Sequence, residues 1–133
     1  MQFYSTNRKT SPVSLREAVV RGLAADRGLF MPEVIRRFPP AFYQNMKEMT
    51  LREISFVVAE AFFGEDVEAG KLKEIVDETL NFDIPLVKVA DNRYSLELFH
   101  GPTLAFKDVG ARFMARLLAY FNKQEGERQV NVF

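Results

Sequence analysis

Cysteine is absent from the sequence, and histidine occurs once in 133 residues. Without cysteine, the chain has no disulfide, no zinc-thiolate site and no cysteine nucleophile. A single histidine cannot form a metal site built from several imidazoles. We therefore predict no metal site and no thiol chemistry.

An excess of charge of either sign is also absent, because 18 basic residues balance 18 acidic ones. No run of Lys or Arg is dense enough to follow a phosphate backbone, so no nucleic-acid partner is predicted. No apolar run reaches the length of a signal sequence or a membrane span, so we predict no membrane partner and expect a cytoplasmic location. The composition, 47% hydrophobic and 27% charged, is typical of a globular protein with one domain or two small ones.

Residues 1–81 are predicted to form a small, mainly helical unit. Two segments begin with Ser or Thr followed three residues later by Glu, which is the pattern of a capping box: Ser14 with Glu17, and Thr50 with Glu53. We expect one helix to begin at Leu15 and a second to run from Thr50 to a C-cap at Gly64. The apolar spacing of "KLKEIVDETLNF" predicts a third helix.

The pattern changes to an α/β arrangement in residues 82–133. The segment "PLVKVADNRYSLELF" has two short strand-like runs around Asp91 and Asn92, which predicts a β-hairpin. An amphipathic helix is predicted to start near Phe106 and to pack through about residue 121. The segment "GERQVNVF" then begins a strand that stops at the last residue. We interpret this as an unfinished sheet, so the chain is expected to be the N-terminal piece of a longer one.

Lys107 stands where a glycine-proline loop turns into that helix. A solvated side chain is the simplest interpretation of any lysine. The partial positive charge of a helix N-terminus, however, favours the neutral amine, and nearby Leu104 and Phe106 are expected to desolvate it further. A neutral amine condenses with an aldehyde to form a Schiff base. Lys107 is therefore a candidate for covalent catalysis, with a solvated surface residue as the alternative.

The residues around Lys107 have less specific interpretations. His100 is either a general base or, as a sole histidine more often is, a packing and hydrogen-bonding residue. Gly101-Pro102 predicts a turn, and Thr103 is expected to cap the helix that follows. Asp108 either faces the ammonium of Lys107 or complements the helix N-terminus.

The segment "LELFHGPTLAFKDVGARFMARLL" closely resembles the cofactor-lysine segment of the threonine synthase family, which has a near-identical "FHGPTLAFKD" before a helix. A second segment, "FYSTNRKTSPVSLREAVVRGLAADRGLFMPE", is similar to the opening pattern of that family. The resemblance covers essentially the whole chain. It implies an α/β fold, that of a fold-type II pyridoxal-phosphate enzyme of the tryptophan-synthase-β-like group. Residues 1–81 would match the N-terminal helical unit, and residues 82–133 the truncated start of the cofactor-binding domain.

The resemblance also implies a reaction. The full-length enzyme would be a carbon-oxygen lyase that converts O-phospho-L-homoserine and water to L-threonine and phosphate. Lys107 would hold pyridoxal 5'-phosphate as a Schiff base, or aldimine, and then move protons at the α and β carbons. Phe106 is implied as a cofactor neighbour, with Asp108, His100 and Thr103 in supporting roles. We expect a monomer at full length and no activity from these 133 residues alone.

The sequence departs from the family pattern in two ways. Arg27 occupies the first of two positions that are usually glycine, and it adds strain if that position needs a positive φ. The family's "S-G-D-T-G" loop, its phosphate cup and the partner of the pyridine nitrogen are not in this sequence. Two alternatives stay open: a phospho-lyase acting on another amino-alcohol phosphate, and a helical interaction module without enzymatic activity.

Overall fold

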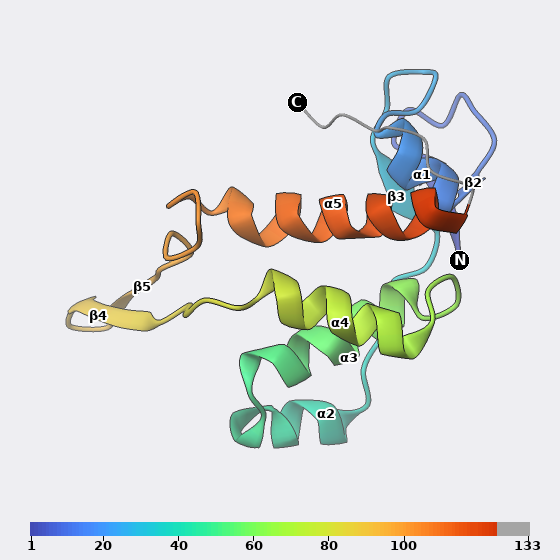
Figure 1. The fold of residues 1–133 in the computed structure, drawn as a ribbon. Coiled ribbons are helices and arrows are strands. Elements are labelled where there is room, and N and C mark those ends of the chain that lie inside the picture. The colour runs from blue at the N-terminus through green and yellow to red at the C-terminus, as the bar shows by residue number, and fades with distance from the viewer. Residues whose placement is uncertain (125–133) are drawn as a thin grey trace. The chain divides into compact units, whose positions relative to one another are not determined.

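Helices make up most of the regular structure in this computed structural model, which describes residues 1–124 (Figure 1). The chain divides into two compact units, Met1–Val76 and Asp77–Phe133, and the division falls inside helix α4 (Ala69–Thr79). The predicted domain boundary after residue 81 stays a prediction. The strand predicted in "GERQVNVF" lies outside the described residues. None of the helices in residues 1–124 has the length and apolar character needed to cross a bilayer.

A three-stranded antiparallel sheet opens the first unit. Strand β1 (Gln2–Ser5) lies between β2 (Val13–Ser14) and β3 (Phe30–Pro32), with Phe3 paired to Val13 on one side and to Pro32 on the other. The sequence pattern does not predict this sheet, because strands of two to four residues are too short to show alternation.

The first predicted helix, α1 (Leu15–Arg21), begins at the expected residue. Its N-cap is Ser14, whose Oγ accepts a hydrogen bond from the Glu17 N–H at 3.2 Å. The Glu17 carboxylate forms an ion pair with Arg21 at 3.0 Å. The hydroxyl half of the predicted capping box is therefore present at this helix.

The second predicted helix, α3 (Leu51–Phe63), has both halves of its capping box. The Thr50 N–H donates to Glu53 Oε2 at 2.7 Å, and the Glu53 N–H donates to Thr50 Oγ1 at 3.3 Å. Gly64 is the C-cap, as predicted. Two short elements precede this helix: α2 (Pro40–Asn45) and the 3-10 turn η1 (Met46–Glu48).

Buried apolar side chains of the first unit come from β1, α1, α3 and α4 and from the loops between these elements. They are Phe3, Leu15, Ala18, Ala24, Ala59, Val67, Leu72, Ile75 and Val76. The apolar spacing that predicts the third helix is thereby confirmed, since Leu72, Ile75 and Val76 are all among these buried side chains.

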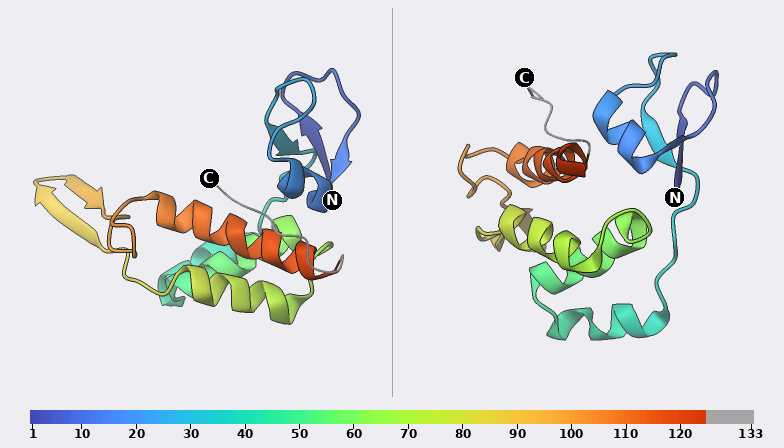
Figure 2. Two further views of the ribbon diagram at one scale, coloured as in Figure 1. Left: turned by 45° about the horizontal axis from the view of Figure 1, so that its top comes forward. Right: turned by 45° about the vertical axis from the view of Figure 1, so that its right-hand side comes forward.

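A β-hairpin begins the second unit, as predicted. Strand β4 (Leu86–Ala90) pairs with β5 (Arg93–Leu96) in an antiparallel register. Asn92 in the connecting turn has a φ of 58°, which asparagine adopts more readily than most residues. All strand residues except Ser95 are exposed. In the left view of Figure 2 the hairpin extends beyond the first turn of helix α5 (Lys107–Gln124).

Helix α5 buries one face. Leu117, Leu118 and Phe121 are buried, as the apolar spacing predicts, whereas Met114 is 40% exposed. In the first turn the buried residue is a carboxylate, Asp108. The C-terminal half of this helix therefore buries apolar side chains, whereas its first turn, which carries Lys107, buries a carboxylate.

Candidate functional site

Lys107 is the first residue of α5. Its side chain is exposed, and its ammonium has no hydrogen-bond or ion-pair partner among residues 1–124. The expected desolvation by neighbours is not found in this part of the chain, since Leu104 is 76% exposed and Phe106 is 74% exposed. The structure therefore presents an accessible amine and two uncovered apolar side chains close to a helix start.

Asp108 holds the loop in front of the helix. Its side chain is 1% exposed, and its Oδ2 accepts a hydrogen bond from the Thr103 N–H at 2.8 Å. Gly101 packs directly against the carboxylate, because a Cβ atom at this position would lie 2.6 Å from Oδ2 and 2.8 Å from the Asp108 Cβ. Of the two expected roles of Asp108, the ion pair with Lys107 is not found among residues 1–124, whereas its place in the first turn of α5 suits the helix N-terminus. Asp108 orders the loop.

Thr103 does not cap the helix as expected. The helix begins at Lys107, four residues later, and Thr103 contributes its backbone N–H to Asp108. The turn predicted at Gly101-Pro102 is confirmed by a hydrogen bond of 3.0 Å from the Leu104 N–H to the Gly101 carbonyl. Leu104 has a φ of 54°, an uncommon value for a non-glycine residue. The buried carboxylate of Asp108 thus binds the loop through the Thr103 N–H.

His100 lies beside a carboxylate. Its Nε2 is 2.7 Å from Glu97 Oε2, and its ring lies 4.7 Å from the Phe99 ring. An imidazole oriented by a carboxylate has the arrangement of a general base, and the same contacts serve a purely structural residue. Both interpretations of His100 stay predictions. His100 also lines an open hollow together with Phe82, Asp83, Ile84 and Pro85.

One residue near Lys107 has a clear structural role that the sequence does not reveal. Arg112 is one turn after Asp108 on α5, and its guanidinium donates to the Thr79 carbonyl at the end of α4. The spacing of Asp108 and Arg112 places them on one helix face, and this is the only sequence feature that could have pointed to Arg112. A charged pair with this spacing is more often a solvated ion pair.

A second polar centre, at Asp26, connects the beginning and the end of the segment "FYSTNRKTSPVSLREAVVRGLAADRGLFMPE". The Asp26 carboxylate accepts hydrogen bonds from Ser5 Oγ at 2.6 Å, from the Gly28 N–H at 3.0 Å and from the Lys9 N–H at 2.9 Å. The hydrogen bond from the Ser5 hydroxyl is the largest of the effects that lower the pKa of Asp26 below its ordinary value. Asp26 therefore connects the loop that follows β1 to the loop that precedes β3.

The two residues after Asp26 explain the departure from the family pattern. Arg27 has a φ of 66°, so the position does need the left-handed conformation that glycine adopts without strain. Gly28 has no room for a side chain, since a Cβ atom would lie 2.0 Å from Ser5 Oγ. The glycine required by close packing is kept, and the position of the replaced one carries backbone strain.

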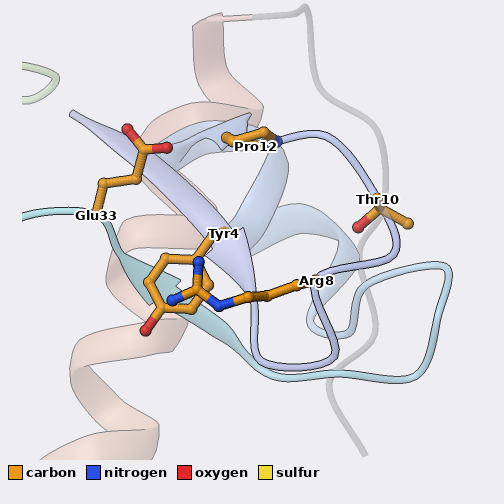
Figure 3. A pocket seen from close by; sticks show the side chains of 5 residues that line it. All are labelled: Tyr4, Arg8, Thr10, Pro12 and Glu33. Carbon is orange, nitrogen blue, oxygen red and sulfur yellow. The ribbon is translucent and has the colours of Figure 1, made fainter.

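A second hollow lies beside the three-stranded sheet of the first unit (Figure 3). It is lined by Tyr4, Arg8, Thr10, Pro12 and Glu33. The Arg8 guanidinium carbon is 4.2 Å from the centroid of the Tyr4 ring, and Figure 3 shows the guanidinium lying over that ring. None of the predicted site residues lines this hollow, so the candidate site is the segment around Lys107.

Comparison with known proteins identifies the family. The model described as "Threonine synthase N terminus" matches residues 2–80. The chain belongs to the threonine synthase family. The threonine synthase of Serratia marcescens is 38% identical over 132 residues, which are 99% of this chain and 30% of that protein. The threonine synthase of Haemophilus influenzae is 41% identical over 119 residues, covering 90% of this chain and 28% of that protein.

Solved threonine synthase structures share the fold. The structure from Escherichia coli superposes with a TM-score of 0.85 at 36% identity, covering 91% of this chain and 28% of that one. The pyridoxal-phosphate-bound structure from Brucella melitensis gives a TM-score of 0.90 at 34% identity, covering 96% of this chain and 29% of that one. The expected α/β fold class of the threonine synthase N-terminal region is confirmed. The chain spans 30% of the length of the Serratia marcescens relative.

Proposed function

We propose that this chain forms the N-terminal part of an enzyme that converts O-phospho-L-homoserine and water to L-threonine and phosphate. The observation that carries the proposal is the accessible, unpaired amine of Lys107 among the described residues, at the start of α5 behind a loop fixed by Asp108. Family membership supports the reaction class, a carbon-oxygen lyase of amino-acid biosynthesis. A cytoplasmic location and a monomeric full-length enzyme are part of the same proposal.

The residues around Lys107 fit pyridoxal phosphate. Its aldehyde needs a primary amine that is neither buried nor engaged in an ion pair, and Lys107 meets both conditions within residues 1–124. The relative from Brucella melitensis binds this cofactor. When bound, pyridoxal phosphate supplies an electron sink that stabilises a carbanion at the substrate. The amine of Lys107 would hold the cofactor and would accept and return protons at the α and β carbons of the substrate.

The neighbours of Lys107 have separate tasks in this proposal. Phe106 precedes the lysine and exposes its ring, which makes it available to flank the cofactor. Asp108 and the Thr103 N–H fix the backbone from which the lysine projects. His100, whose Nε2 lies 2.7 Å from Glu97 Oε2, is the auxiliary base in this proposal.

The test uses the full-length protein. Borohydride reduction after addition of pyridoxal phosphate is expected to leave the reduced cofactor on the peptide that contains Lys107, as mass spectrometry would show. Phosphate release from O-phospho-L-homoserine is expected in the unmodified enzyme and is expected to be lost in Lys107→Ala. Product analysis decides the substrate: release of phosphate from another amino-alcohol phosphate without formation of threonine would replace this proposal by the phospho-lyase alternative.

The 133 residues alone provide a second test. We expect no phosphate release from this chain, because it spans 30% of the length of its Serratia marcescens relative. Phosphate release by the purified chain that is abolished by Lys107→Ala would contradict this expectation. A cellular role that survives Lys107→Ala in the full-length protein would favour the interaction-module alternative.

A further inference from the structure

The guanidinium of Arg112 connects α5 to the C-terminal end of α4. Its Nη1 donates to the Thr79 carbonyl at 2.9 Å, and its Nη2 donates to the Glu78 carbonyl at 2.8 Å and to Asn81 Oδ1 at 3.0 Å. One side chain thus binds the last residues of one helix and the segment that leaves it, from a position five residues after Lys107.

An arginine suits this position better than a lysine. The last carbonyls of a helix have no partner within it, and that end carries a partial negative charge. A planar guanidinium presents several N–H donors in a fixed geometry, whereas an ammonium is a point charge on a flexible stem. The Phe82 ring, 5.6 Å from the guanidinium carbon, adds a cation-π contact. The hydrogen bonds of Arg112 therefore depend on its shape as well as its charge.

Arg112 and Asp108 together determine how α5 is rotated about its axis. They are four residues apart, so they lie on one face of the helix. Asp108 holds the loop before the helix, and Arg112 holds the end of α4. Lys107 precedes Asp108 and projects about 100° away around the axis. A rotation or a shift of α5 would break at least one of the two anchors, and the lysine amine would move with the helix.

We propose that Arg112 is a positioning residue for Lys107, which it holds in place by fixing α5 to the end of α4. It does not touch the reacting atoms. The structural part of this inference stands on the contacts above, and its catalytic part rests on the proposed function. The expected consequence is that loss of the guanidinium loosens the loop at Thr103 and displaces the amine of Lys107.

Arg116 offers a matched control on the same helix. It lies one turn after Arg112, and its Nε donates to Glu78 Oε2 at 2.8 Å. The Glu78 side chain is 55% exposed, and exposed ion pairs of this kind contribute little to stability. Arg116→Gln therefore removes the contact to Glu78 and a 3.2 Å hydrogen bond from the Arg116 Nη1 to the Arg112 carbonyl within α5. The bonds from Arg112 to the α4 carbonyls stay in place.

The first experiment measures amide hydrogen exchange in the cofactor-free, full-length protein. Arg112→Gln is expected to speed exchange of the Thr103 amide, while amides in α3 of the first unit exchange as before. Arg116→Gln is expected to leave the Thr103 amide near its original rate, and Arg112→Lys to restore protection only in part. Equal exchange at Thr103 in Arg112→Gln and Arg116→Gln would overturn the inference. If Arg112→Gln fails to fold, the same comparison is made with Arg112→Lys.

The second experiment compares catalysis by the same variants. Arg112→Gln is expected to displace the Lys107 amine and so to lower kcat by about 100-fold, with a much smaller change in KM. Misplacement of a catalytic group by about 1 Å can have an effect of this size. Arg116→Gln is expected to stay within about twofold of the original kcat. An active enzyme in which Arg112→Lys keeps the full kcat would overturn the positioning role and leave the proposed function intact. If borohydride does not trap the cofactor on Lys107 of the unmodified enzyme, the proposed function fails. Hydrogen exchange then still shows whether Arg112 holds the loop at Thr103 in place.

Discussion

Gly101 and Asp108 lie so close together that a Cβ atom on Gly101 would stand 2.6 Å from Asp108 Oδ2. Gly101→Ala is therefore expected to lower the free energy of unfolding of the full-length protein by about 1–3 kcal/mol, the usual cost of overpacking. Chemical denaturation measures this. Gly110→Ala is the control, because no atom outside its own helix backbone and chain neighbours lies within 4 Å of the new Cβ. Alanine there is expected to raise stability by about 0.5–1 kcal/mol, so equal effects at the two sites would contradict the packing argument.

Arg27 holds a left-handed backbone conformation with a φ of 66°. Arg27→Gly removes the clash between a Cβ atom and the following carbonyl, so we expect stability to rise by about 1 kcal/mol. Gly22 provides the reverse test, since it has a φ of 71° and open space around it. Gly22→Ala is expected to lower stability by about 1 kcal/mol through backbone strain alone. Thermal unfolding measures the stability change in both variants. A destabilised Arg27→Gly protein would show that a contact of the Arg27 side chain stabilises the fold by more than the backbone strain costs.

The Asp26 carboxylate links pH to stability. Its pKa in the folded chain is lowered, chiefly by the hydrogen bond from Ser5, and the pKa of an unfolded aspartate is about 3.9. The stability that Asp26 contributes is therefore fully present above the unfolded value and is lost as the pH falls through the folded value. We expect Asp26→Asn to be less stable than the original protein at neutral pH, and this difference to shrink on acidification below about pH 4.

Urea denaturation across this pH range measures the effect of Asp26. Glu33→Gln is the control, because the Glu33 carboxylate is exposed and has no hydrogen-bond or ion-pair partner among the described residues. That variant is expected to stay close to the original stability at every pH. A stability difference for Asp26→Asn that stays constant as the pH falls would show that the loss comes from altered packing and not from the charge.

The N-cap at Thr50 has both hydrogen bonds of a capping box, whereas the N-cap at Ser14 has one, so their loss is expected to affect stability differently. Thr50→Ala removes the acceptor of the Glu53 N–H and one half of a reciprocal box, so it is expected to lower stability by about 1 kcal/mol. Ser14→Ala is expected to lower it by less, because the Glu17 carboxylate pairs with Arg21. Circular dichroism during urea denaturation provides both values. A larger loss at Ser14 would indicate that its hydroxyl has a further role.

Local signals in the sequence predict local structure well in this chain. The capping patterns at Ser14 and Thr50 and the turn at Asn92 each involve residues within a few positions, and each is confirmed, at Ser14 for the hydroxyl half alone. The sheet of β1, β2 and β3 depends on pairing between strands far apart in sequence, which no short pattern encodes.

The site shows the same limit. The position of Lys107 at a helix start follows from the sequence, but the loop before it is fixed by side chains whose partners lie elsewhere. Thr103 is a reasonable cap by residue type, but the helix begins four residues later, and its N–H donates to a buried carboxylate five residues later. The partners of Arg112 lie more than thirty residues earlier in the chain, so no spacing rule reveals them.

The exposed hairpin has a consequence for the placement of the lysine. In residues 1–124, β4 and β5 pair only with each other, so the outer edge of each strand presents N–H and carbonyl groups without strand partners. Strand β5 leads through residues 97–106 directly to Lys107. A strand that adds to β5 is expected to fix the end from which residues 97–106 lead to α5. Addition of a strand to the hairpin is therefore expected to restrict the segment that carries the Lys107 amine.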